Sequence, residues 1–357
     1  MNSRERVFKA LRFERPDRAP RDLWTVPGIA MFHPEDLKAV VERYPNDIVL
    51  IDDAWGASVG GYGSLKEAGE ALCFRYGRSG RAHGTPYLVG TYTDDWGVPF
   101  TCGEDGIVGE VKQPPITDWK LLEHFKPPWE TLTGANWDDV NRIHDASDKF
   151  LLTPWHVDPF ERMQFLRGTQ RIYTDLGEGS KEVLLLRDMV HEFCLKEIEL
   201  WCKTDIDGIR FSDDWGSQRG PLISPKMWRE IFKPMYAGYA ALARAAGKPV
   251  FYHTDGHVAA LVADFIEIGV NAMNMQLFCM DIEDLARRFK GKLTFWGELD
   301  RQKSLSFGTP EDVYRDVRRV RKALDDGQGG VIAQFEWYKN VPRANVEAAF
   351  EAWLEPM

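Results

Sequence analysis

Paired aspartates stand beside a tryptophan at three places in the chain: IDDAWG at 51–56, TDDWGV at 93–98 and FSDDWGSQ at 211–218. Adjacent carboxylates repel each other, and an indole ring is costly to leave in water. Two carboxyl groups that face one cavity of low dielectric raise the pKa of one of them, which produces a general acid. We therefore expect Asp52 and Asp214 to be catalytic proton donors that line one pocket.

The other aspartates of these pairs have different expected roles. We expect Asp53 and Asp213 to contact substrate; the structural alternative is that one member of each pair caps the helix or loop after its strand. Asp94 and Asp95 lie in a glycine-rich stretch. That position is typical of a structural turn or a pocket lid.

Three further groups could carry acid–base or metal chemistry. His253 and Asp255 are two residues apart, so both side chains lie on one face of a strand, as two metal ligands from one strand require. An isolated His-x-Asp is more often structural, and that alternative stays open. Glu298 is an acid–base group or a metal ligand, and His156 in PWHVDP is a general base or a hydrogen-bonded support.

Tryptophan is abundant, with 13 residues in 357. Core packing accounts for some of them. The others would form an aromatic box for an aryl or other apolar methyl donor, or for a quaternary ammonium through cation–π contact. The candidates for this substrate-binding box, most of which follow or end a predicted strand, are Trp24, Trp55, Trp155, Trp215, Trp296 and Trp337.

Strands alternate with helices along most of the chain. We predict helices near 3–13 and 33–44, over 118–146 with an interruption, up to 204, and over 225–246, 257–267, 282–289, 310–324 and 342–354. Residues 57–115 are rich in glycine and alternate in hydrophobicity, which predicts hairpins inserted after the first recognised strand. The seven recognised strands are 47–53, 150–155, 207–214, 249–255, 271–275, 292–298 and 330–336.

This alternation predicts a parallel sheet with right-handed crossovers, either a (β/α)8 barrel with one unrecognised strand or a doubly wound sheet. The barrel is favoured because the chemistry-bearing residues stand at the carboxyl ends of strands, where barrel active sites lie. A nucleotide-binding sheet lacks support, since no GxGxxG or GxxxxGK[ST] follows a strand. We expect a TIM barrel with a hairpin insertion after the first strand.

Composition excludes several classes of protein. The 44% hydrophobic and 28% charged residues are typical of a globular chain, and the net charge of −10 argues against a nucleic-acid partner. No apolar run has the length of a membrane span, and the N-terminal segment has no apolar signal region. Five cysteines without a CxxC pair suggest reduced thiols. We expect a cytoplasmic protein without a membrane partner.

Five segments resemble the uroporphyrinogen decarboxylase superfamily, which also contains the zinc-dependent, corrinoid-linked methyltransferases. They are SRERVFKALRFERPDRAP at 3–20, DGIRFSDDWGSQRGPLISPKMWREIFKPMY at 207–236, GKPVFYHTDGHVAALVADFIEIGVNAMN at 247–274, TFWGELDRQ at 294–302 and GGVIAQFEWYKNVPRANVEAAFEAW at 329–353. The resemblance covers nearly the whole chain and is weakest at 57–115. It implies one (β/α)8 barrel domain over residues 1–357, and a homodimer.

The resemblance also implies roles for particular residues. Decarboxylases of this family receive porphyrinogen carboxylates on paired arginines near the N-terminus, where this chain offers only Arg21, so uroporphyrinogen is not the expected substrate. Asp52 falls at the position of their catalytic aspartate, and Asp214 near their substrate-binding serine. The zinc ligands of the methyltransferases, His-x-Cys and a later Cys, correspond here to the metal-ligand candidates His253, Asp255 and Glu336.

The expected activity is therefore methyl transfer from a small methylated or methoxylated substrate to a corrinoid on a separate partner protein. The expected cofactor is a divalent metal, with zinc as the first choice. Hard carboxylates would also accept Mn²⁺, Fe²⁺ or Mg²⁺. Two alternatives stay open. One is a metal-independent decarboxylase or lyase in which Asp52 or Asp214 protonates a carbanion. The other is a small-molecule-binding barrel without catalysis.

Overall fold

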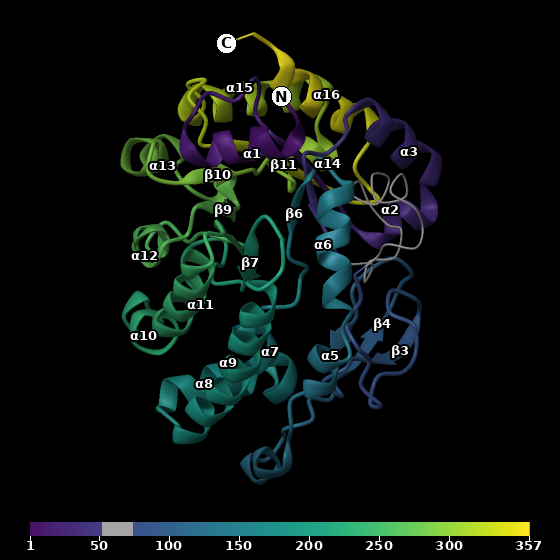
Figure 1. Ribbon diagram of the computed structural model, residues 1–357, viewed down its shortest axis with the longest axis vertical. Coiled ribbons are helices and arrows are strands. Elements are labelled where there is room, and N and C mark those ends of the chain that lie inside the picture. The colour runs from purple at the N-terminus through teal and green to yellow at the C-terminus, as the bar shows by residue number, and fades with distance from the viewer. Residues whose placement is uncertain (52–73, 357) are drawn as a thin grey trace.

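The computed structural model describes residues 1–51 and 74–356, and its main element is a curled parallel sheet (Figure 1). All five neighbouring pairs of strands in this six-stranded sheet are parallel. The first and last strands of the chain lie side by side, with Trp24 opposite Glu336. In spatial order the strands are β1 (Arg21–Thr25), β11 (Val331–Trp337), β10 (Thr294–Trp296), β9 (Ala272–Met275), β8 (Val250–Thr254) and β7 (Ile209–Ser212).

Two more parallel strands, β2 (Ile48–Leu50) and β6 (Phe150–Leu152), pair with each other. A parallel bridge from Leu152 to Gly208 links β6 to the segment that leads into β7. On the other side, the backbone N–H of Asp47 donates to the carbonyl oxygen of Arg21 at the start of β1 (2.8 Å). The described chain is thus an α/β fold with a half-barrel of parallel strands and a two-stranded sheet beside it.

Helix α1 (Ser3–Arg12) packs against the interior of these sheets. Its Val7 and Leu11 form a buried cluster with residues of β2, β6, β8, β9, β10 and β11, among them Phe150 and Phe251. The helix begins with a capping box between Asn2 and Glu5, so Asn2 is the cap. Because this apolar cluster fills the interior of the sheets, the polar side chains gather at the carboxyl ends of the strands.

Most other helices pack outside the strands; in Figure 1, α10 to α13 lie to one side of β7–β10. Each buries one face against the large hydrophobic core. The helices are α2 (Pro27–Phe32), α3 (Pro34–Arg43), α5 (Trp129–Thr133), α6 (Trp137–Ala146), α7 (Pro159–Arg167), α8 (Thr169–Glu178), α9 (Lys181–Trp201), α10 (Pro225–Ile231), α11 (Lys233–Ala245), α12 (Val262–Ile268), α13 (Ile282–Phe289), α14 (Ser304–Phe307), α15 (Pro310–Leu324), α16 (Arg343–Leu354), and the 3₁₀ helices η1 (Trp119–His124) and η2 (Leu277–Cys279).

Between β2 and β6 the described chain contains a small antiparallel sheet of β3 (Gly90–Thr93), β4 (Pro99–Cys102) and β5 (Glu110–Val111). It lies within the predicted hairpin stretch 57–115. Residues 52–73 are outside the described part, so the insertion as a whole stays a prediction.

Two element predictions need correction. The strand β1 was not recognised, and the helix expected over 225–246 is two helices, because Pro234 stands in the first turn of α11 and cannot continue the backbone ladder of α10. The stretch 118–146, which was predicted with an interruption, consists of η1, α5 and α6.

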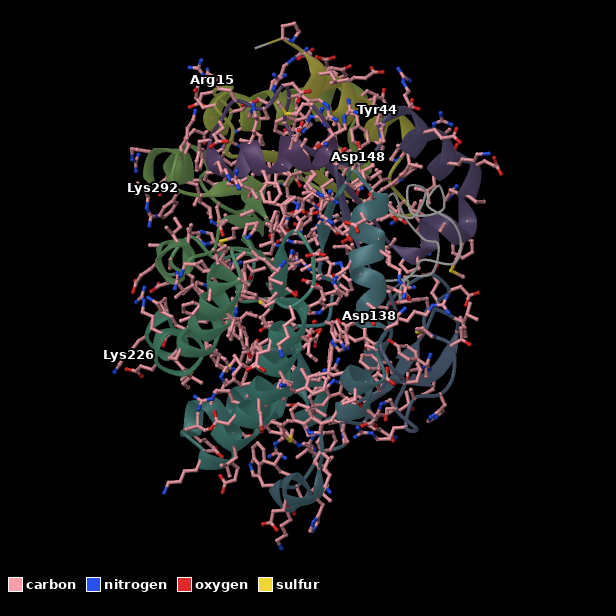
Figure 2. The ribbon with its side chains drawn as sticks, viewed as in Figure 1. Arg15, Tyr44, Asp138, Asp148, Lys226 and Lys292 are labelled. Carbon is pink, nitrogen blue, oxygen red and sulfur yellow. The ribbon has the colours of Figure 1, made fainter. Side chains whose placement is uncertain are left out.

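Charged side chains cover the outside of the fold. Lys226 and Lys292 are exposed and lie at the edge of the view in Figure 2. Among the helices of the described residues, we find none with both the length and the apolar character that crossing a membrane requires.

Candidate active site

A cavity of about 1050 Å³ opens at the carboxyl ends of the parallel strands. Side chains from seven of these strands or the loops after them reach it, which is the usual position of a site in folds of this kind. They include Trp24, Trp155, Asp214, His253, Arg301 and Glu336.

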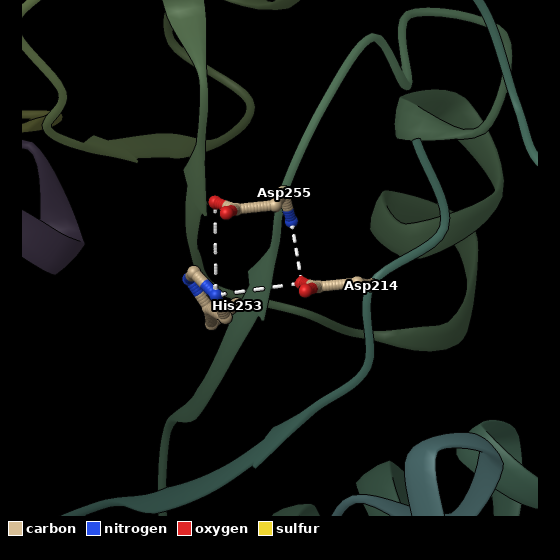
Figure 3. A group of neighbouring side chains, drawn as sticks. All are labelled: Asp214, His253 and Asp255. Atoms are coloured by element: carbon tan, nitrogen blue, oxygen red, sulfur yellow. Dashed lines mark hydrogen bonds and ion pairs between the residues drawn. The ribbon is translucent and has the colours of Figure 1, made fainter. Parts of the chain in front are cut away.

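Asp214, His253 and Asp255 all line the cavity. They form a compact group (Figure 3). One ligand atom from each lies within 4.8 Å of the others. His253 Nε2 is 3.6 Å from Asp214 Oδ1 and 3.9 Å from Asp255 Oδ1. The backbone N–H of Asp255 donates to Asp214 Oδ1 (2.9 Å), which joins the ends of β7 and β8. Asp255 is the first residue after β8, and its carboxylate lies close to the ring of His253, two residues earlier.

Asn274 on β9 determines which nitrogen of His253 is free. Its Nδ2 donates to the carbonyl oxygen of Trp296 (2.6 Å) and to Gln334 Oε1 (2.7 Å). Because a carbonyl oxygen can only accept, Asn274 Oδ1 must face His253 Nδ1, 2.6 Å away, and accept its proton. Neutral His253 therefore carries its lone pair on Nε2, on the side of the two aspartates.

Arg301, in the loop after β10, lies between carboxylates of three strand ends. Its guanidinium contacts Asp255, Glu336 Oε2 (2.8 Å) and, more distantly, Glu298 Oε1 (3.4 Å). It also donates to the Tyr338 hydroxyl (3.1 Å). These negative neighbours raise the pKa of Arg301 although burial lowers it.

Glu336 is consequently outside the group that His253 and Asp255 form. It accepts from Arg301 and from the Tyr338 hydroxyl (2.6 Å). The structure replaces it by Asp214 as the third donor near His253. Glu298 is 4% exposed, and burial raises its pKa well above the ordinary range. Glu298 is not among the described residues that line the cavity.

Asp213, the neighbour of Asp214, has a structural position. Its carboxylate accepts from the backbone N–H groups of Phe160 (2.9 Å) and Glu161 (2.7 Å) in the first turn of α7, and from the Tyr236 hydroxyl. It is 2% exposed, and burial raises its pKa well above the ordinary range. It thus caps α7, a helix that precedes its own strand, rather than the segment after it.

A second acidic wall comes from the start of α7. Burial and the carboxylates of Asp158, Asp214 and Asp213 raise the pKa of Glu161 well above the ordinary range. Arg162 beside it is ion-paired with Asp94, whose other oxygen accepts from the Val98 backbone in a turn. All these residues except Val98 line the cavity.

Two tryptophans of the predicted box, Trp24 and Trp155, line the cavity and are half-buried. Their rings meet edge to face at 4.9 Å, and both contact the ring of His253 in the same way (5.4 and 5.0 Å). The other described members, Trp215, Trp296 and Trp337, are 1% exposed or less, and each donates its N–H inside the fold.

His156 lies behind the cavity wall. Its Nδ1 is 2.6 Å from Glu197 Oε2, and its ring stacks on Tyr76 at 4.2 Å. Burial lowers the pKa of His156, but the Glu197 carboxylate more than offsets this and raises it overall. His156 is thus a hydrogen-bonded support, and among the described residues it does not reach the cavity.

Three predicted site residues, Asp52, Asp53 and Trp55, fall within 52–73 and lie outside the described residues. We predicted no role for Asp22, Asn274, Glu161 or Arg301. Arg301 stands three residues after Glu298 in a segment that resembles the superfamily, which was the available signal. Asn274 on β9 lies directly opposite His253 on β8 in the register of the two strands, so both side chains are on the same face of the sheet.

Comparison with known families fits this geometry. The sequence profile of the family described as uroporphyrinogen decarboxylase (URO-D) matches residues 88–355. The match extends over most of the chain, so the protein belongs to the URO-D family. A search of curated proteins finds no match.

Among solved structures, a methyltransferase from Methanosarcina mazei is similar over 99% of this chain and 98% of its own, with a TM-score of 0.69 and 15% identity. At that identity the likeness establishes the fold. A xylanase from Gloeophyllum trabeum (14% identity, 61% and 79% covered, TM-score 0.38) and a 3-keto-D-glucoside 4-epimerase from E. coli (12%, 69% and 97%, 0.36) match less well. Scores this low support no inference.

Proposed function

We propose that this protein is a metal-dependent methyltransferase that moves a methyl group from a small methylated or methoxylated substrate to a corrinoid carried by a separate protein. The observation that carries the proposal is the group of Asp214, His253 and Asp255 beside two cavity-lining tryptophans. Family membership and the fold shared with a methyltransferase support it.

The donor atoms fit a divalent metal, and zinc is the candidate that we favour. Catalytic zinc sites use three protein ligands, and the imidazole nitrogen and carboxylate oxygens of this group are donor types that zinc accepts. His253 Nε2 is the nitrogen left free by Asn274, so the histidine is already oriented for such a role. When bound, the metal would act as a Lewis acid toward the heteroatom that carries the methyl group.

The residues around this group have complementary tasks. Trp24 and Trp155 would hold an apolar or aromatic donor against the histidine. The methyl carbon would form its new bond to cobalt(I) and leave the electron pair of the broken bond on the donor heteroatom. Glu161 lines the cavity, burial raises its pKa well above the ordinary range, and it would give that heteroatom its proton.

The test is alkylation of cob(I)alamin by the purified protein in the presence of methoxylated aromatic and methylammonium donors. We expect the cob(I)alamin absorption to disappear with at least one donor, and His253→Ala to abolish the change. No change across a broad panel of donors would overturn the proposal.

A second candidate is metal-independent decarboxylation or lysis of a small carboxylate, with Asp52 or Asp214 as the acid. The observation in its favour is that two guanidinium groups, Arg162 and Arg301, line the cavity, where they could receive a carboxylate. It predicts activity that survives chelation and is lost in Asp214→Asn.

We further propose that the eight parallel strands close into one (β/α)8 barrel that spans the chain. The bridge from Leu152 to Gly208 and the hydrogen bond from Asp47 to Arg21 support closure on the two sides of the β2–β6 pair. A crystal structure with continuous pairing from β1 through β2 and from β6 to β7 would establish it, and an open edge at either place would contradict it.

A further inference from the structure

One carboxylate oxygen joins two tryptophans at the floor of the cavity. Asp22 Oδ2, on β1, accepts the indole N–H of Trp24 (2.8 Å) and that of Trp296 (2.7 Å). The two indole rings meet nearly at right angles, with centroids 5.1 Å apart. Asp22 is 4% exposed, so these two donors come from within the fold.

The arrangement extends from Asp22 to the proposed metal ligands. Trp24 meets the rings of both Trp155 and His253 edge to face. Trp155 is in turn covered by the guanidinium of Arg210, whose Cζ lies 3.4 Å from the ring centroid. Trp24 is therefore held by a hydrogen bond at its N–H and by contacts with the rings of Trp155 and His253, and it links Asp22 to His253.

A buried carboxylate is costly unless hydrogen bonds compensate for its lost hydration. An apolar residue would fill the same space at the strand position of Asp22 without that cost. The fact that the acceptor serves two indoles, one of them lining the cavity, indicates that its task is to fix their orientation.

We propose that Asp22 is a positioning residue that fixes Trp24 through its indole N–H, so that Trp24 and Trp155 form a rigid aromatic wall for the flat face of an aryl methyl donor. This inference rests on the proposed function for the identity of the donor. The positioning itself concerns only the chain's own residues.

The test compares Asp22→Asn with Asp22→Leu. The asparagine oxygen can still accept both indole N–H groups, whereas leucine has a similar size and no acceptor. Near-ultraviolet circular dichroism reports the tryptophan environment, and quenching of tryptophan fluorescence reports binding of methoxybenzene as the probe. We expect the asparagine variant to keep the wild-type spectrum and to bind methoxybenzene within about threefold of wild type, and the leucine variant to lose both, with binding weakened about tenfold or more.

Equal spectra and equal binding in wild type and Asp22→Leu would overturn the proposal, as would equal impairment in both variants. If Asp22→Leu fails to fold, Trp24→Phe, which removes the N–H and keeps a ring, takes its place with the same expected loss. Failure of wild type to bind methoxybenzene would overturn the aryl-donor assignment. These readouts do not require methyl transfer. A protein that alkylates no cob(I)alamin would refute the proposed function, but the comparison of the Asp22 variants would still test the positioning role.

Discussion

His253 Nδ1 lies 2.6 Å from Asn274 Oδ1, and this contact fixes the tautomer of the histidine at the candidate metal site. The amide of Asn274 cannot be reversed, because its Nδ2 already donates to the Trp296 carbonyl oxygen. A supporting residue on β9 thus directs Nε2 of a residue on β8 toward Asp214 and Asp255.

Replacement of Asn274 by leucine should weaken metal binding without removing a ligand. Outer partners of metal-bound histidines commonly contribute about 10- to 100-fold in affinity, so we expect a loss in that range. Zinc titration by calorimetry measures it. Asn271→Leu makes the same chemical change three residues earlier, where the side chain accepts from the Val250 backbone, and should leave zinc affinity unchanged. Equal affinity in wild type and Asn274→Leu would contradict the assigned role.

The adjacent residues Asp213 and Asp214 should behave in opposite ways. Asp213→Ala removes the acceptor of two buried donors and one partly buried donor. A buried donor left unsatisfied costs about 1–3 kcal/mol, so the free energy of unfolding should fall by several kcal/mol. Asp214→Ala should mainly lower zinc affinity, because its side chain is 49% exposed in the cavity. Urea unfolding and zinc titration of both variants would reveal the pattern, and a reversed pattern would contradict these positions.

Arg301 should be required for stability as well as for the site. Arg301→Gln leaves Asp255, Glu298 and Glu336 close together without their cation. Breaking such a buried pair costs about 3–5 kcal/mol of unfolding free energy. Arg301→Lys keeps the charge but not the planar fork, and should recover part of the loss. A loss below about 1 kcal/mol in urea unfolding of Arg301→Gln would show that Arg301 is dispensable there.

Asp22 should make stability depend on pH near neutrality. Burial raises the pKa of Asp22 to about 7, although the two indole hydrogen bonds and the charge of Arg210 lower it. Because the folded state holds this proton more tightly than the unfolded state, the free energy of unfolding falls as pH rises from about 4 through about 7. A difference of about 3 pKa units corresponds to about 4 kcal/mol.

Asp22→Asn cannot titrate, so the stability of this variant relative to wild type should increase by up to that amount between pH 4 and pH 8. Chemical denaturation of both proteins at a series of pH values measures the difference, in which the contributions of other titrating groups cancel. A difference that stays constant with pH would show that Asp22 does not titrate in this range.

Local signals predicted much of the scaffold but little of the long-range pairing. Helices α13 and α15 were predicted with their observed bounds, because an Asp or Thr cap and a regular apolar face define each of them. Strand β1 was missed because Asp22 interrupts its apolar residues. The buried position of this aspartate depends on a local hydrogen bond from Trp24 and on a long-range one from Trp296.

The candidate site was only partly predicted, because some of its contacts also depend on long-range pairing. Spacing on one strand brought His253 and Asp255 together, whereas the third donor depends on which strand ends meet. Arg301 separates Glu336 from the pair and leaves Asp214 beside it, and no sequence pattern contains that information. Likewise, a tryptophan at a strand end can face the cavity, as Trp155 does, or the core, as Trp215 does.

The most direct test of the central claim is the metal content of the protein purified without a histidine tag or chelator, measured by elemental analysis beside His253→Ala and Glu336→Gln. Glu336 is the matched control, because it contacts Arg301 and lies outside the three-residue group. We predict near-stoichiometric metal in wild type and in Glu336→Gln, and its loss in His253→Ala. Metal that is absent from wild type, or that persists in His253→Ala, would contradict the account.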